Sequence, residues 1–169
     1  KFHKPAGYIT AVEDPTHPVV MDLLPPEFKK MGVFPVGRLD KDTEGLLLLT
    51  NDGIWAHSII NGHKHVPKVY YVEFNGKLTK EGIEHIETGI VLGDGTQCKP
   101  ANIDVLSEQS LHITIEEGKY HQVKRMIGAA GGEVNYLKRL SIGHITLNGI
   151  EAINTYSEID DQDVVDFKK

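Results

Sequence analysis

The sequence has little cysteine and no long apolar run. Its single cysteine, Cys98, excludes an internal disulfide and fits a reducing cytoplasm. No apolar run approaches the ~20 residues that span a bilayer, and the first residues do not form a signal-peptide pattern. We therefore expect a cytoplasmic protein without a membrane partner.

The usual cofactor motifs are also missing. Neither the dinucleotide fingerprint nor the phosphate-binding P-loop occurs, and no serine or threonine lies in a nucleophile elbow. His63 and His65 could contribute two metal ligands, and His57 is near them in the chain, but a metal site needs three or four compactly arranged ligands and no further partner is evident. We expect no cofactor and no metal, and histidines that are solvated or face phosphates.

What is present is an ordinary globular composition with an uneven charge distribution. The 169 residues, 40% of them hydrophobic and 25% charged, predict one domain over residues 1–169, with room for two lobes. The net charge of −6 argues mildly against a nucleic-acid partner. However, residues 119–139 are mainly basic and the residues from 151 onward are mainly acidic. A local basic patch can bind phosphates even where a distant acidic tail makes the net charge negative. A random distribution of charges over the surface is the alternative.

The order of apolar runs and turn signals predicts an α+β fold. Short apolar or β-branched runs predict strands at 8–12, 33–36, 46–49, 69–74, 101–106, 111–115, 134–140 and 144–147. Helices are predicted at 19–24, 54–60, after Thr79, at 120–130 and in the acidic tail after Asp160. Pro25 and Pro26 should stop the first helix, and Asp52 should cap the second. Many strands with few, non-alternating helices favour a mixed, mostly antiparallel sheet with flanking helices.

Residues 34–53 form the stretch around which the chain is organised. A charged loop, 38–44, lies between two apolar runs that read as buried strands, and loops held by core elements often carry functional groups. Asp40 has Arg38 and Lys41 beside it, and Lys124 or Arg125 could add a second cation. A carboxylate beside a fixed cation stays ionised, which suits a nucleophile or a stabiliser of positive charge on a sugar. Asp40 could equally be a turn residue that bonds the backbone.

Two further side chains leave alternatives open. Tyr70 and Tyr71 lie next to each other in a predicted strand and so face opposite sides, one toward the core and one toward a possible ligand such as a base. Cys98 has no obvious base beside it and fits a buried structural cysteine.

Four motifs, in order, resemble those of a known family. Residues 37–48 are similar to the signature of the pseudouridine synthases, in particular the RsuA family, which acts on bacterial small-subunit 16S ribosomal RNA. Residues 4–8 with 14–18 resemble the first motif of the family, 68–70 its Lys-x-Tyr motif, and 117–126 its third motif. Residues 139–147 continue the match, which thus runs from about Phe2 to Leu147.

The resemblance implies a fold, an activity and a set of site residues. It implies the pseudouridine synthase fold with a central active-site cleft, and an isomerase without cofactor or metal. By position, Asp40 is the catalytic aspartate, Tyr70 stacks on the flipped uracil, and Lys124 pairs with Asp40, with Arg125 as the fallback. Arg38 helps to displace the target base. The remaining RNA-binding positions are Lys68, Lys119, His121, Gln122 and Arg125.

The resemblance also sets expectations about partners. Members usually carry an N-terminal RNA-binding domain, whereas this sequence starts almost on the first motif, so we expect the catalytic domain alone. We expect a monomer that acts on small-subunit ribosomal RNA or on an assembling small subunit.

The chemistry suits the residues, and the alternatives are specific. Pseudouridine formation moves the ribose bond from a uracil nitrogen to carbon 5 without net redox change, and one carboxylate can suffice because the uracil stays bound. A large-subunit ribosomal RNA synthase of the same family is one alternative. A non-catalytic RNA-binding or ribosome-assembly module is another. A nucleoside hydrolase or glycosidase would need a second carboxylate, such as Asp42 or Glu44.

Overall fold

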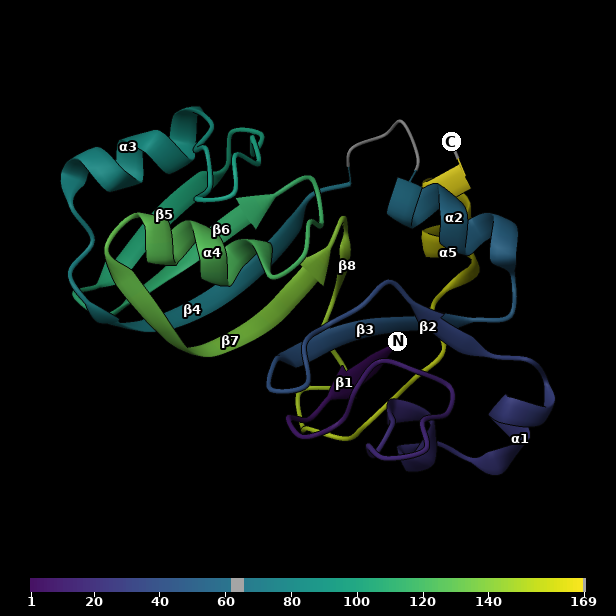
Figure 1. Ribbon diagram of the computed structural model, residues 1–169. Coiled ribbons are helices and arrows are strands. Elements are labelled where there is room, and N and C mark those ends of the chain that lie inside the picture. The colour runs from purple at the N-terminus through teal and green to yellow at the C-terminus, as the bar shows by residue number, and fades with distance from the viewer. Residues whose placement is uncertain (62–65, 169) are drawn as a thin grey trace. The chain divides into compact units, whose positions relative to one another are not determined.

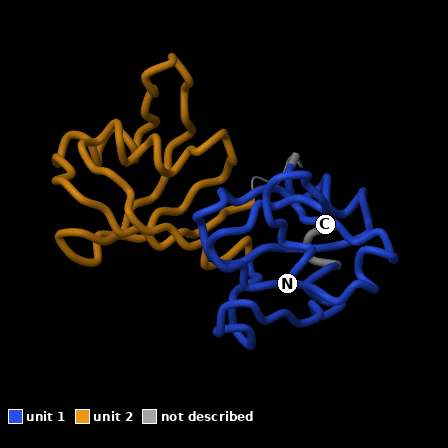
Figure 2. The backbone as a smooth tube through the Cα atoms, turned by 60° about the horizontal axis from the view of Figure 1, so that its bottom comes forward, with its two compact units in different colours: residues 1–64, 144–169 blue, residues 65–143 orange. Residues whose placement is uncertain are grey.

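The computed structural model describes residues 1–61 and 66–168, and it divides the chain into two compact units. The first unit comprises residues 1–64 and 144–169, and the second comprises residues 65–143 (Figure 2). Within the described residues, every helix is too short or too polar to cross a membrane.

The first unit is built on a small antiparallel sheet. Its long strand β3 (Glu44–Thr50) pairs with β1 (Phe2–Lys4) along its first half and with β2 (Phe34–Val36) along its second half (Figure 1). The leucine run of β3 is fully buried from Leu46 to Leu48, as the continuous apolar pattern predicted. Strand β8 (Ile145–Thr146) belongs to the same unit, and the chain returns so that Tyr156 lies opposite Phe2.

Four helices complete this unit. They are the 3-10 helix η1 (Val20–Leu23) and the α-helices α1 (Pro26–Lys30), α2 (Gly53–Asn61) and α5 (Asp161–Lys168). Asp52 caps α2 as predicted, because its Oδ1 accepts hydrogen bonds from the backbone N–H groups of Ile54 and Trp55, both at 3.1 Å. The Trp55 indole N–H donates to the Val164 carbonyl at 3.2 Å and so links α2 to α5.

The second unit is a four-stranded antiparallel sheet with two helices. Its strands are β4 (Lys68–Gly76), β5 (Asn102–Ser107), β6 (Ser110–Ile115) and β7 (Gly132–Ile142), in the order β7-β4-β6-β5. Helix α3 (Lys80–Thr88) contacts β5, and α4 (Gln122–Ala129) contacts β7. Alternate residues of β4, Tyr70, Val72 and Phe74, are buried, which is the period-2 pattern of a sheet covered on one face.

The α+β class with mostly antiparallel pairing is thus confirmed, whereas one predicted strand is wrong and one short helix was not predicted. Residues 8–12 make only one isolated bridge, from Ile9 to Val19, and the first strand is Phe2–Lys4 instead. Pro25 and Pro26 end the 3-10 helix as expected, but Pro26 also begins α1, since proline is tolerated in the first turn of a helix.

Candidate active-site loop and basic helix

The loop that carries Asp40 leaves β2 and enters β3 of the first unit. Gly37 opens it with a φ of 76°, a backbone conformation that favours glycine. Leu39 and Thr43 are 6% and 2% exposed and anchor the loop in the core. Arg38 is exposed and Asp40 half-buried between these anchors, and the Thr43 N–H donates to the Asp40 carbonyl at 3.0 Å. The backbone that carries the Asp40 side chain is therefore fixed from both sides.

A buried lysine forms hydrogen bonds with the backbone of this loop. The Lys4 side chain is fully buried, and its ammonium donates to the carbonyls of Asp40 (3.2 Å), Lys41 (3.1 Å) and Thr43 (2.6 Å). It also bonds the carbonyl of Pro5 at 3.0 Å. Charge-assisted hydrogen bonds are stronger than neutral ones, so these contacts make the loop rigid.

The segment after Lys4 adds two further contacts to the loop. The Gly7 N–H donates to the Lys41 carbonyl at 2.8 Å. The Thr10 hydroxyl lies 3.3 Å from both the N–H and the carbonyl oxygen of Leu39, and it accepts from the first and donates to the second. The segment thus fixes the residue before Asp40 and the residue after it.

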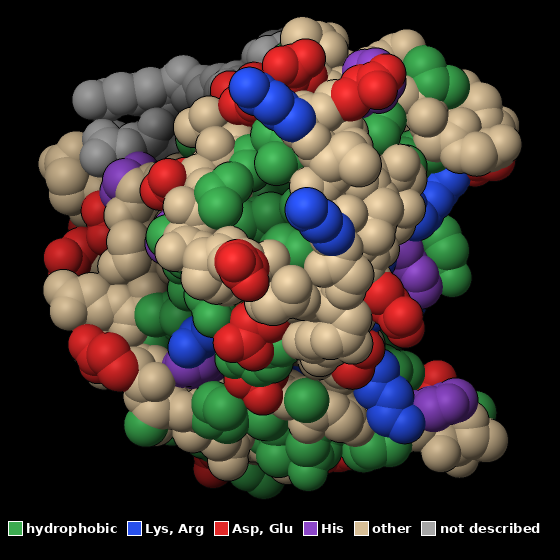
Figure 3. Space-filling view, turned by 90° about the vertical axis from the view of Figure 1, so that its left-hand side faces the viewer, with side chains coloured by type: hydrophobic (Ala, Val, Ile, Leu, Met, Phe, Trp, Pro, Cys, Tyr) green, Lys and Arg blue, Asp and Glu red, His purple; other side chains and the backbone are tan. Residues whose placement is uncertain are grey.

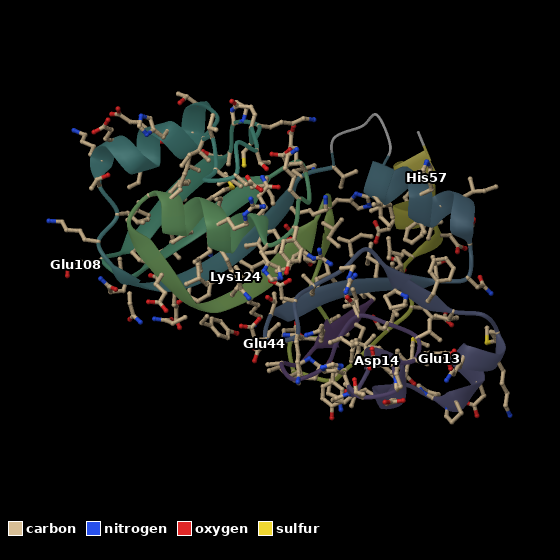
Figure 4. All side chains as sticks on the ribbon, in the orientation of Figure 1. Glu13, Asp14, Glu44, His57, Glu108 and Lys124 are labelled. Carbon is tan, nitrogen blue, oxygen red and sulfur yellow. The ribbon has the colours of Figure 1, made fainter. Side chains whose placement is uncertain are left out.

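The Lys4 ammonium lies in the field of the acidic loop. Burial lowers the pKa of Lys4 from 10.5 to about 8, and the negative charges of Asp42, Glu44 and Asp40 oppose that shift. Glu44 stands at the start of β3 (Figure 4). The loop therefore carries three carboxylates around one buried positive charge.

The second unit contributes Tyr70 and two cations on neighbouring strands. Tyr70 is 8% exposed and lies opposite Arg139, whose Nη1 is 3.5 Å from the Tyr70 hydroxyl oxygen. Burial and the charge of Arg139 both lower the pKa of Lys68. Tyr71 points to the other face of the sheet, where its hydroxyl donates to Glu73 at 2.8 Å. Of the two tyrosines, Tyr70 is the one that belongs to the buried, cationic side.

The predicted RNA-binding residues of the third motif lie at the start of α4. The Gln122 side chain is buried; its carbonyl oxygen accepts from the Lys119 N–H at 3.0 Å, and its amide donates to Glu117 at 2.8 Å. The Lys119 ammonium is 3.7 Å from Glu117. These bonds give Gln122 an internal role in holding the 117–122 turn, and its contact with RNA stays a prediction.

The two candidate cations of α4 differ in their surroundings. Arg125 forms an ion pair with Asp94 at 2.6 Å, and its Nη1 donates to the Tyr120 carbonyl at 3.1 Å. The pKa of Asp94 falls to about 2, mainly through hydrogen bonds with Thr96 and also through Arg125. Lys124 is half-buried on the same helix (Figure 4). The guanidinium of Arg125 is thus already engaged within its own unit.

The metal and cysteine candidates can be compared with the described residues. No group of three or more histidine, cysteine, aspartate or glutamate side chains there could hold a metal ion. His63 and His65 lie outside the described residues. Cys98 is 1% exposed, and burial raises the pKa of its thiol, which confirms a structural cysteine.

Sequence reasoning missed the residues that position the others. Lys4 and Thr10 give no local signal of their role, because their partners are backbone groups about 30 to 40 positions away in the chain. Tyr120 was not predicted as a site residue, and the structure shows that it is exposed. Its position between a glycine-containing turn and a basic helix is the sequence signal that could have identified it.

The comparisons with known proteins agree with these motifs. The family model for RNA pseudouridylate synthase matches residues 2–129. A Bacillus subtilis protein described as an uncharacterized RNA pseudouridine synthase is 45% identical over 167 residues, which cover 96% of this chain and 70% of that protein. The ribosomal small subunit pseudouridine synthase A of Escherichia coli is 37% identical over 166 residues, 96% of this chain and 71% of that protein.

Solved structures give the same assignment. A crystal structure of a pseudouridylate synthase matches with a TM-score of 0.90 and 32% identity, over 98% of this chain and 71% of the other. An archaeal box H/ACA complex of Nop10 and Cbf5 matches at a TM-score of 0.56 and 14% identity, which shows a shared fold. The chain belongs to the RNA pseudouridylate synthase family and is an RNA pseudouridine synthase, an isomerase.

Proposed function

We propose that this enzyme converts a specific uridine of 16S ribosomal RNA to pseudouridine, with Asp40 as the catalytic carboxylate. The observation that carries the role of Asp40 is the construction of its loop, in which the Lys4 ammonium and the Thr10 hydroxyl fix the backbone on both sides. The RNA class follows from relatives such as the small subunit synthase of Escherichia coli.

The proposed reaction needs one carboxylate and no redox partner. The bond from ribose C1′ to uracil N1 breaks, and Asp40 stabilises the positive charge that develops at C1′. The uracil turns while it stays bound, and its C5 bonds to C1′. The C5 proton leaves and N1 takes up a proton, so that atoms and charge balance.

The other residues take supporting roles in this proposal. The uridine must leave its stack at a cost of a few kcal/mol, which the exposed Arg38 offsets by filling the gap. The Tyr70 ring stacks on the flipped uracil, and base–aromatic stacking contributes ~1–3 kcal/mol. Lys124 pairs with the Asp40 carboxylate. Lys68, Lys119 and His121 contact the RNA.

The test is release of tritium from 16S RNA labelled at uracil C5, because forming the carbon–carbon bond expels that atom. Wild-type enzyme should release label, and Asp40→Asn should release none while it binds RNA with a Kd within about twofold of wild type. Asp42→Asn, which changes a neighbouring exposed carboxylate of the same loop, is the matched control and should keep activity. Substantial release by a folded Asp40→Asn variant would remove Asp40 from the role.

The same assay separates the alternatives. Label release from 23S but not from 16S RNA would move the substrate to the large subunit. Release of free uracil would indicate a hydrolase. If naked 16S RNA is inert, label release from an assembling small subunit would identify that particle as the substrate. Inertness of both would favour a non-catalytic assembly module.

A further inference from the structure

An exposed pair of rings stands at the start of α4. Tyr120 is 76% exposed, an unusually open position for an aromatic side chain. Its ring stacks on the imidazole of His121, with 3.8 Å between the centroids and 16° between the planes. One face of the Tyr120 ring stacks against His121. The opposite face of the ring is therefore available to another flat group.

The backbone under this pair is fixed before any ligand arrives. His121 is the N-cap of α4 and holds a left-handed conformation with a φ of 46°, which few non-glycine residues adopt. The Tyr120 carbonyl accepts a hydrogen bond from Arg125, and the buried Gln122 ties the turn to Lys119 and Glu117. A rigid platform loses little conformational entropy on binding, and strained backbone of this kind is often found at binding sites.

The charges around the pair favour a base over a phosphate. Two basic side chains close to the pair in the sequence, Lys119 and Arg125, are already paired with Glu117 and Asp94. In Figure 3, basic and acidic side chains are interspersed over the face shown, without one continuous basic surface. Because these two cations are compensated and the Tyr120 ring is 76% exposed, the turn offers stacking more than phosphate attraction.

We propose that the Tyr120–His121 pair is a stacking platform for an unpaired RNA base other than the target uridine. The target is assigned to Tyr70, which is 8% exposed on the sheet, whereas Tyr120 is 76% exposed at the start of the helix. The pair thereby adds recognition of single-stranded RNA to that of the target uridine. The inference rests on the proposed function only for the choice of 16S RNA as the probe.

The test measures the Kd for 16S RNA by filter binding, which does not depend on turnover. Tyr120→Ala should weaken binding by roughly 5- to 150-fold, the equivalent of ~1–3 kcal/mol for one stacked base. Tyr120→Phe keeps the ring and should stay within about twofold of wild type. The ratio between Tyr120→Ala and wild type should be the same at 50 and at 200 mM salt, because stacking releases no counterions.

Two controls separate this platform from a general surface effect. Leu106→Ala removes an exposed apolar side chain from β5 of the same unit and should leave the Kd unchanged. For a fully double-stranded RNA, the Kd of Tyr120→Ala should equal that of wild type, since no base is free to stack. Equal Kd values of Tyr120→Ala and wild type for 16S RNA would overturn the inference. It would also be overturned if Tyr120→Phe lost as much affinity as Tyr120→Ala. Absence of tritium release by wild type from both naked 16S RNA and an assembling small subunit would refute the proposed function and leave the Kd result standing.

Discussion

At the scale of single residues, Lys4 is the position where a distant side chain should control the chemistry. We expect Lys4→Met to lower kcat at least tenfold, because three carbonyls from Asp40 to Thr43 lose their ammonium donor and the carboxylate shifts. The Kd for RNA should stay within about threefold. Lys41→Met, which removes an exposed lysine of the same loop, is the control and should keep kcat. An unchanged kcat in Lys4→Met would show that other contacts suffice to hold the loop.

The lowered pKa of Lys4 makes a second prediction, about pH. The ammonium titrates near 8 in the folded protein and near 10.5 in the unfolded chain, so between these values the unfolded chain binds more protons. The contribution of Lys4 to the free energy of unfolding therefore rises with pH across this window. Urea unfolding should be measured at pH 7 and at pH 10 for wild type and for Lys4→Met. From pH 7 to pH 10, the free energy of unfolding of wild type should rise on the order of 1–3 kcal/mol relative to that of Lys4→Met. A difference that falls with pH would contradict the burial of this charge.

At the scale of elements, two glycines of the α4 region should respond in opposite directions. Gly131 has a φ of 107°, and an added Cβ would lie 2.8 Å from the Lys77 carbonyl oxygen, so Gly131→Ala should destabilise the protein by about 2–4 kcal/mol. Gly128 is helical and exposed with open space around it, so Gly128→Ala should stabilise by about 0.5–1 kcal/mol. Thermal unfolding of both variants is the measurement. Similar melting temperatures would mean that the Gly131 turn relaxes freely.

The same elements show what the sequence could and could not predict. The cap at Asp52 and the helix start at Thr79 could be predicted, because each of these side chains bonds a backbone N–H within three residues. Strand β1 was missed because two of its three residues, His3 and Lys4, are polar and yet fully buried. Their burial depends on partners far along the chain, such as the Ile150 carbonyl for His3, which local pattern does not contain.

At the scale of the whole molecule, the predicted site residues are divided between the two compact units. Arg38 and Asp40 belong to the first, whereas Tyr70, Lys124 and the other predicted RNA contacts belong to the second. The order of the motifs in the sequence identified both groups of site residues, but it did not predict the local structure around either group. The structure added the internal bonds that give each group its local geometry: the Lys4 clamp in one unit, and the Gln122 anchor and the Arg125–Asp94 pair in the other.

The charge of the whole chain leads to a last prediction, about salt. A basic segment such as 119–125 would by itself favour steep salt dependence, but two of its cations are ion-paired and the chain carries a net charge of −6. Few phosphates can then be neutralised, and about two such contacts give a slope of log K against log salt near −2. The Kd for 16S RNA should thus rise only about tenfold between 50 and 200 mM salt. Asp94→Asn frees Arg125 and should steepen the slope by about one, whereas Asp104→Asn on β5 should not change it. A wild-type slope of −5 or steeper would mean that unpaired cations elsewhere dominate RNA binding, because stacking alone cannot produce it.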